Sequence, residues 1–147
     1  MIPNFDNTGY LPEGIYDATI AEYEQRFVYN VVRKEIHAGL LRLLKELKTI
    51  GCKSVFIDGS FVTLKEHPKD VDVCWDNRGV DLAEAEKKLP ILWDMTHPRL
   101  AQQTLFRADV FPAFALEVGS KKMFLDFFQQ IKHEEHIKKG IIKIDIL

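Results

Sequence analysis

Two acids lie on one face of a segment that has the pattern of a β-strand, and this arrangement limits the possible folds. Asp70-Val71-Asp72-Val73 alternates acidic and apolar residues, which is the period of a β-strand with one polar face. Two carboxylates separated by one strand residue lie on the same side, roughly 6 to 7 Å apart at the backbone. We therefore expect Asp70 and Asp72 to share one region of solvent, with Val71 and Val73 turned into the core.

A metal ion is the natural partner for such a pair. Two like charges placed so closely repel one another unless a cation lies between them. Mg²⁺ suits this position because it prefers oxygen ligands and takes one or two carboxylates together with substrate phosphates. The alternative is an edge strand with a solvated acidic face, and the alternation of residues alone leaves both interpretations open.

A glycine–serine pair precedes the two acids. Ser54-Val55-Phe56-Ile57 is a short apolar run that predicts a buried strand, and it stops at Asp58-Gly59-Ser60. A helical turn is predicted from Phe61 to Lys65. At such a junction backbone N–H groups can hold a phosphate, glycine allows its close approach, and Ser60 adds a hydroxyl donor. Taken alone, Gly-Ser is also a common turn.

The N-terminal part of the chain predicts an arm followed by a long helix. Residues 1–18 are rich in Pro, Asn, Gly and Asp and predict an irregular arm. Thr19, with Glu22 three residues later, predicts a capping box that opens a helix. Apolar residues then recur at mostly helical spacing, with a break near Asn30. The basic residues of this helix, Arg33 among them, are assigned to its polar faces.

The remaining segments predict further helices and strands. Residues 81–89 and 123–131 are predicted to be helical, whereas residues 105–111 and 141–147 are predicted to be strands. No internal repeat or low-complexity segment interrupts the chain. We therefore expect one α+β domain that spans residues 1–147.

Taken together, the apolar strand, Gly59-Ser60, nine further residues and Asp-Val-Asp-Val resemble the signature of the nucleotidyltransferase superfamily, the DNA-polymerase-β-like fold. The resemblance implies a mixed β-sheet flanked by helices on one face. It also implies a third acid on a later strand, for which Asp109 is the candidate and Asp126 the rival. Asp126 lies in a segment predicted to be helical, while Asp109 could instead be a strand-end aspartate or a helix cap.

The resemblance extends over most of the chain. The Leu-Pro-x-Gly-Ile arm at Leu11–Thr19, the Gly-Ser-Phe-Val-Thr-x-Lys loop at Gly59–Lys65 and the segment Lys139–Ile142 are similar to an uncharacterised bacterial branch of this superfamily.

The family mechanism would assign a role to each matching residue. Asp70 and Asp72 would hold two Mg²⁺ ions, and Asp109 would be a further ligand and a base. Gly59 and Ser60 would hold the triphosphate of the nucleotide. Lys65 could reach the phosphates as a point charge, or could simply be a solvated lysine.

The function that the resemblance implies is transfer of a nucleoside monophosphate from an NTP to a hydroxyl of RNA or protein. Small stand-alone members of the superfamily often belong to toxin–antitoxin or phage-defence systems. The alternative is a degenerate nucleotidyltransferase that binds nucleotide or a partner protein without turnover. A cognate partner protein could also complete the site.

Composition limits the other possibilities. The net charge of −2 gives no strong field for a polyanion, so a nucleic-acid partner is permitted but not indicated. The sequence has no run of 18 or more apolar residues, so we expect no membrane-spanning segment. Cys52 and Cys74 are too isolated in sequence for a disulfide framework, which favours a reducing compartment and a cytoplasmic protein.

Overall fold

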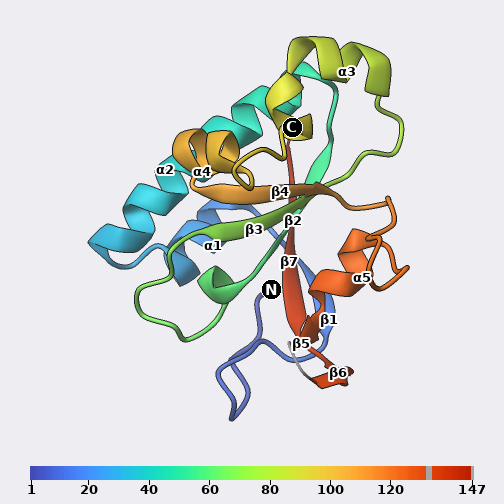
Figure 1. Cartoon of the computed structure of the whole chain (residues 1–147). Coiled ribbons are helices and arrows are strands. Elements are labelled where there is room, and N and C mark those ends of the chain that lie inside the picture. Colours follow the sequence, from blue (N-terminus) through green and yellow to red (C-terminus); the bar gives the residue numbers. More distant parts are fainter. Residues whose placement is uncertain (132–133, 147) are drawn as a thin grey trace.

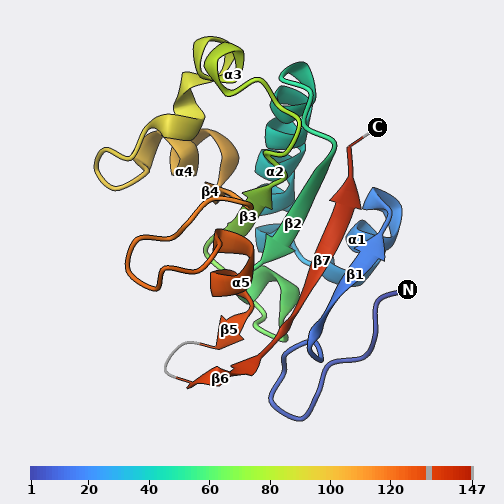
Figure 2. The same ribbon diagram turned by 90° about the vertical axis from the view of Figure 1, so that its right-hand side faces the viewer.

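A computed structural model describes residues 1–131 and 134–146 of the chain. Its centre is a five-stranded mixed sheet of order β1-β7-β2-β3-β4, as Figure 2 shows from the side. The outer pairs β1–β7 and β3–β4 are parallel, and the inner pairs are antiparallel. The strands are β1 (Gly14–Ala18), β2 (Ser54–Asp58), β3 (Val71–Trp75), β4 (Ala108–Pro112) and β7 (Gly140–Asp145), while β5 (Gln130–Ile131) and β6 (Glu134–Lys138) form a separate pair.

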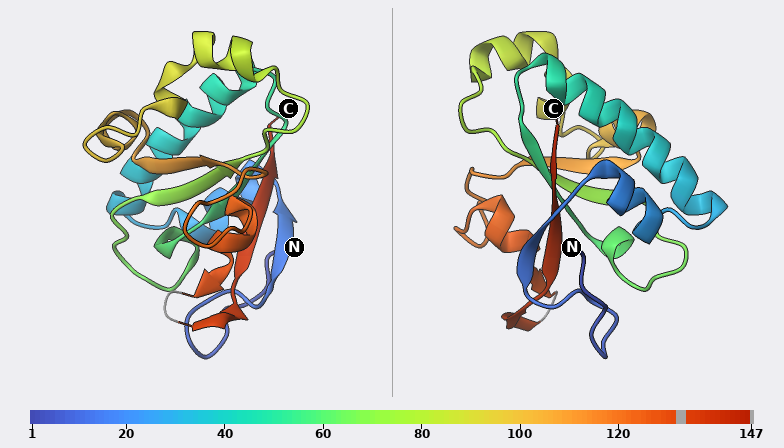
Figure 3. Two further views of the ribbon diagram at one scale, coloured as in Figure 1. Left: turned by 45° about the vertical axis from the view of Figure 1, so that its right-hand side comes forward. Right: turned by 180° about the vertical axis from the view of Figure 1, so that it is seen from behind.

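The larger helices cover one face of this sheet (Figure 1). The helical elements are α1 (Ile20–Phe27), α2 (Val31–Thr49), α3 (Leu82–Lys88), α4 (Leu100–Phe106) and α5 (Phe124–Phe128), with short 3₁₀ turns η1 (Ser60–Val62) and η2 (Pro90–Trp93). The predicted α+β architecture with a mixed sheet is confirmed. The short helix α5 is the exception to the one-sided layer, because it lies against the opposite face (Figure 3).

Strand alternation divides the apolar residues between the two faces. Val55 and Ile57 of β2 belong to the main core beneath α1 and α2, whereas Phe56 belongs to a smaller cluster with Leu125 of α5. The same alternation on β3 sends Val73 into the main core and Cys74 into the smaller cluster. The second face is therefore only partly covered by apolar packing.

The predicted helix start and helix break are both observed. The hydroxyl of Thr19 accepts a hydrogen bond from the backbone N–H of Glu22 (3.1 Å), which caps α1. The side-chain oxygen of Asn30 accepts one from the N–H of Arg33 (2.8 Å) and caps α2. Among the described residues, no helix is both long enough and apolar enough to cross a membrane.

The prediction of an irregular arm over residues 1–18 is wrong for its last part. Gly14–Ala18 forms β1, which pairs with β7 from the far end of the chain. This strand depends on a partner more than 100 residues away in sequence, which local composition does not reveal. Residues 1–13 contain no regular element, as predicted.

Three other predicted boundaries are corrected. The strand predicted from residue 105 begins at Ala108, because α4 continues to Phe106 and ends at Arg107 in a left-handed conformation (φ 52°). The helix predicted over residues 123–131 is confined to Phe124–Phe128. The last strand ends at Asp145, and Leu147 lies outside the described residues.

Arg33 is fully buried, so its predicted place on a polar helix face is wrong. Its guanidinium donates hydrogen bonds to backbone carbonyls on two segments, namely Phe27 (2.9 Å), Phe61 (2.6 Å), Thr63 (3.2 Å), Lys65 and Glu66 (3.4 Å). Guanidinium has five N–H donors in a fixed plane, which suits a cluster of carbonyl oxygens. Arg33 thus ties the segment between β2 and β3 to the junction of α1 and α2.

We predict that Arg33→Lys lowers the free energy of unfolding by about 2 to 4 kcal/mol, because a single ammonium leaves several of these carbonyls without a donor. Arg42→Lys is the matched control, since Arg42 is exposed on the same helix and, among the described residues, its guanidinium donates only to the Leu105 carbonyl (3.2 Å). Urea denaturation of both variants tests the difference. Equal stability of the two would contradict a structural role for Arg33.

Candidate active site

Three aspartates lie side by side across adjacent strands. Asp58 of β2 is opposite Asp72 of β3, and Asp72 is opposite Asp109 of β4. Neighbouring strands are about 4.8 Å apart, so the backbones of these residues are adjacent. By strand alternation, all three belong to the face that carries Phe56 and Cys74. The predicted placement of Asp72 and Asp109 on neighbouring strands is observed, whereas Asp58 was not predicted as a site residue.

Asp70 reaches the same place from the residue just before β3. The side-chain amide of Gln103, on α4, donates hydrogen bonds to Asp70 Oδ2 (3.1 Å) and to Asp109 Oδ1 (2.9 Å). The side-chain nitrogen of Gln103 thus joins two of the predicted site acids. The sequence did not predict Gln103 as a site residue. The rival acid Asp126 lies on α5, outside the row of strand aspartates.

The site carries more negative charge than its neighbouring cations, Lys139 and Arg99 among them, offset. Burial and the charges of the neighbouring aspartates raise the pKa of Asp72 to about 7. The pKa of Asp70 is also raised, by burial first and then by the charge of Asp109. Burial raises the pKa of Asp58 to about 6, and the Lys139 ammonium opposes that shift. A bound proton or a cation would relieve this repulsion.

Gly59 is placed directly against Asp72. Its φ of +83° is favourable for glycine, and a Cβ atom there would lie 2.6 Å from Asp72 Oδ2. The glycine is therefore required both by its backbone conformation and by the approach of the carboxylate. The helical turn predicted from Phe61 to Lys65 is present only as the shorter turn η1.

A hollow of about 530 Å³ opens beside Asp72. Its walls come from the arm, from the segment after β2 and from the residue before β7. The lining residues are Thr8, Gly9, Tyr10, Gly59, Ser60, Thr63, Leu64, Lys65, Asp72 and Lys139. All three residues predicted to bind nucleotide, Gly59, Ser60 and Lys65, therefore share one hollow with a predicted metal ligand.

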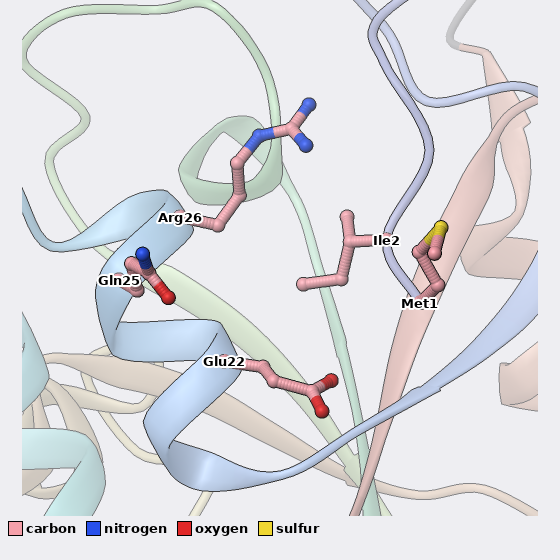
Figure 4. Close-up of a pocket in the computed structure, with 5 residues that line it drawn as sticks. All are labelled: Met1, Ile2, Glu22, Gln25 and Arg26. Atoms are coloured by element: carbon pink, nitrogen blue, oxygen red, sulfur yellow. The ribbon is translucent and has the colours of Figure 1, made fainter.

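A second hollow, of about 540 Å³, lies against α1 and is shown in Figure 4. Its lining residues are Met1, Ile2, Glu22, Gln25 and Arg26. None of these belongs to the row of aspartates or to the Gly59–Lys65 segment. We take the hollow beside Asp72 as the candidate site, because its lining includes a member of the row of strand aspartates.

The carboxylates suit a divalent cation that prefers oxygen ligands and whose remaining coordination positions are filled by a bound ligand. In the part of the chain that the structure describes, no three His, Cys, Asp or Glu side chains form a ready-made metal-binding group. The side-chain amide of Gln103 donates hydrogen bonds to both Asp70 and Asp109. A cation in the same place could neutralise the charges of the two carboxylates. Mg²⁺ does not need an all-protein cage, since it usually takes one or two carboxylates plus water and phosphate oxygens.

The fold and the site define an α+β protein with a row of acids beside a hollow that contains lysines. The chain belongs to DUF6932, a family of unknown function, whose model matches residues 3–145. No curated protein and no solved structure matches the chain.

The raised pKa of Asp72 predicts how stability depends on pH without metal. Between about pH 4 and pH 7 the Asp72 carboxyl is protonated in the folded protein but ionised in the unfolded chain. The contribution of Asp72 to the free energy of unfolding therefore falls as pH rises through this range. Asp72→Asn removes the effect. In EDTA the variant should be more stable than wild type at pH 8, by at least about 1 kcal/mol, and the gap should shrink towards pH 4.

Urea denaturation across this pH range measures the gap. Asp17→Asn, which removes one exposed carboxylate from β1, controls for the change in net charge. A gap for Asp72→Asn that stays constant or widens at acid pH would contradict the electrostatic account.

Proposed function

We propose that this chain is a Mg²⁺-dependent nucleotidyltransferase that moves a nucleoside monophosphate from an NTP to a hydroxyl of RNA or protein. The observation that supports this most is the register of β2, β3 and β4, which sets Asp72 beside Asp109. Gln103 joins Asp70 to the same group, and Gly59 lies against Asp72 at the mouth of a hollow.

Asp70 and Asp72 would hold two Mg²⁺ ions, with Asp109 as a further ligand. When bound, these ions neutralise phosphate charge and lower the pKa of the acceptor hydroxyl. Carboxylates that already repel one another gain from such a cation, since the negative charges around Asp72 disfavour its ionised form.

Other residues of this chain would position the nucleotide and move the proton. Ser60 donates its hydroxyl to a phosphate oxygen, while Gly59 lets the Asp72 carboxylate lie directly against the backbone that precedes Ser60. Asp109 accepts the proton of the acceptor hydroxyl. The acceptor oxygen forms a bond to the α-phosphorus, the bond from that phosphorus to the α,β-bridging oxygen breaks, and pyrophosphate leaves.

The biological setting is part of the proposal. The resemblance of the sequence to small stand-alone nucleotidyltransferases favours a role in a toxin–antitoxin or phage-defence system. In such a system a cognate partner protein could complete the site. Cys52 and Cys74 are both buried and free, which fits a reducing, cytoplasmic environment.

Loss of a metal ligand should abolish metal-dependent nucleotide binding. Asp70→Asn and Asp72→Asn keep the side-chain shape but remove the charge that attracts Mg²⁺. We expect each variant to lose Mg²⁺-dependent NTP binding by calorimetry while remaining folded. Asp126→Asn is the control, because it removes the rival acid on α5. Unchanged Mg²⁺–NTP affinity in both site variants would rule out the metal assignment.

Asp109 separates an enzyme from a degenerate binding module. Binding of a Mg²⁺–nucleotide depends mainly on the triphosphate, whereas chemistry also requires removal of the acceptor proton. In an enzyme, Asp109→Asn should leave NTP affinity within about tenfold and lower transfer by at least about a hundredfold.

Incubation with each radiolabelled NTP, Mg²⁺ and whole-cell RNA or protein measures that transfer. A binding module would label no acceptor even as wild type, and Asp109→Asn would change little. That pair of results would favour the alternative function.

A further inference from the structure

Lys139 is a cation at the site to which the proposed mechanism gives no role. It lies just before β7, and only 15% of its side chain is exposed. Its Nζ is 3.4 Å from Asp58 Oδ1 and 5.8 Å from the centre of the Tyr10 ring. The residue also lines the hollow beside Asp72. The ammonium group of Lys139 thus lies at the wall of the candidate site.

The ion pair with Asp58 is incomplete. The side chain of Asp58 is 2% exposed, and among the described residues neither of its oxygens accepts a hydrogen bond of good geometry. At 3.4 Å, the contact between Lys139 Nζ and Asp58 Oδ1 is longer than a charge-assisted hydrogen bond usually is. Buried charges are costly unless they are both paired and hydrogen-bonded. An ammonium has three N–H donors, so Lys139 retains capacity for another acceptor.

The hollow has the chemistry of a polyanion site. Lys139 and Lys65 supply two ammonium groups and Ser60 supplies a hydroxyl, while Asp72 lies at one side as a predicted metal ligand. A volume of about 530 Å³ lies within the usual range of ligand pockets. A polyphosphate is a ligand that can bind both a divalent cation at Asp72 and the ammonium group of Lys139 in the same hollow.

The wall that carries Tyr10 is fixed in place. The carboxylate of Asp6 accepts hydrogen bonds from the backbone of Thr8 (2.8 Å) and Tyr10 (3.2 Å), which shapes this turn of the arm. The carbonyl of Gly9 accepts one from the N–H of Leu64 (3.0 Å), so the turn is attached to the segment after β2. The arm is therefore part of the hollow, and Lys139 lies beside it.

The geometry points to Lys139 as the residue that binds the outer phosphates of the nucleotide, exchanging part of its contact with Asp58 for phosphate oxygens. This inference rests on the proposed function, because it takes an NTP polyphosphate as the ligand. The competing role is purely structural, with Lys139 serving only to neutralise Asp58.

The test compares variants in which Asp58 carries no charge. Lys139→Met alone would leave Asp58 buried without its counter-ion, so lost binding could reflect misfolding. In an Asp58→Asn background that problem is absent. The probe is inorganic tripolyphosphate with Mg²⁺, titrated calorimetrically, and circular dichroism on heating checks that each variant is folded.

Asp58→Asn/Lys139→Met should bind tripolyphosphate at least about tenfold more weakly than Asp58→Asn, because a charge-assisted contact to phosphate is lost. Asp58→Asn/Lys139→Arg should retain affinity within about threefold, since the charge remains. Lys138→Met in the same background is the matched control, because Lys138 is exposed one residue away. Equal affinity of Asp58→Asn with and without Lys139→Met would overturn the inference.

A measurement on the wild-type side chains covers the case in which the double variants unfold. Reductive ¹³C-methylation keeps the lysine charges, and the signal of Lys139 can be assigned by its absence in Lys139→Arg. Addition of Mg²⁺–tripolyphosphate should shift this signal and leave that of Lys138 in place. An unmoved Lys139 signal at saturating tripolyphosphate would overturn the inference.

The outcome is separable from that of the proposed function. Tripolyphosphate binding that depends on Lys139, in a protein that labels no acceptor, supports the inference and contradicts the enzyme. Nucleotidyl transfer with the same KM for NTP in Asp58→Asn and Asp58→Asn/Lys139→Met supports the enzyme and overturns the inference.

Discussion

The buried guanidinium of Arg33 is the interaction on which the arrangement of the site depends. It binds carbonyls of Phe61, Thr63 and Glu66, within the segment that joins β2 to β3. That segment begins just after Gly59 and leads to Asp70, so one side chain of α2 fixes the connection between both halves of the site. No carboxylate among the described residues balances the charge, and the carbonyl dipoles stabilise it instead.

The register of β2, β3 and β4 places three aspartates side by side on the face of the sheet that carries the smaller apolar cluster. Asp58, Asp72 and Asp109 face one another across three strands, and the pKa of Asp72 is raised to about 7. Such an arrangement lowers the stability of the free protein at neutral pH. Strain of this kind is typical of sites whose charges are completed by a ligand. The Gln103 amide and the neighbouring cations, Lys139 and Arg99 among them, compensate for only part of it.

The sequence predicted the parts of the site that follow from local pattern. Asp70 and Asp72 follow from the period of a strand, and the helix start after Thr19 follows from capping chemistry. Asp58 and Gln103 were missed because their proximity to the other acids depends on strand register and on the packing of α4, which are non-local. A strand ending in an acid, directly before Gly59, was the available signal for Asp58.

Arg33 and β1 were missed for different reasons. Arg33 was assigned to a polar face because helical periodicity treats every charged residue as solvent-facing, although a guanidinium can be buried where carbonyls converge. The strand Gly14–Ala18 was hidden by the Pro- and Gly-rich arm around it, and its pairing partner lies at the other end of the chain.

The most direct test of the central claim is a crystal structure with Mn²⁺ in place of Mg²⁺ and a non-hydrolysable NTP analogue. Mn²⁺ can be located by its anomalous scattering. We predict two peaks among the carboxylates of Asp70, Asp72 and Asp109, with the phosphates in the hollow beside Ser60. A peak elsewhere, or a nucleotide bound in the second hollow by Glu22 and Arg26, would contradict the account.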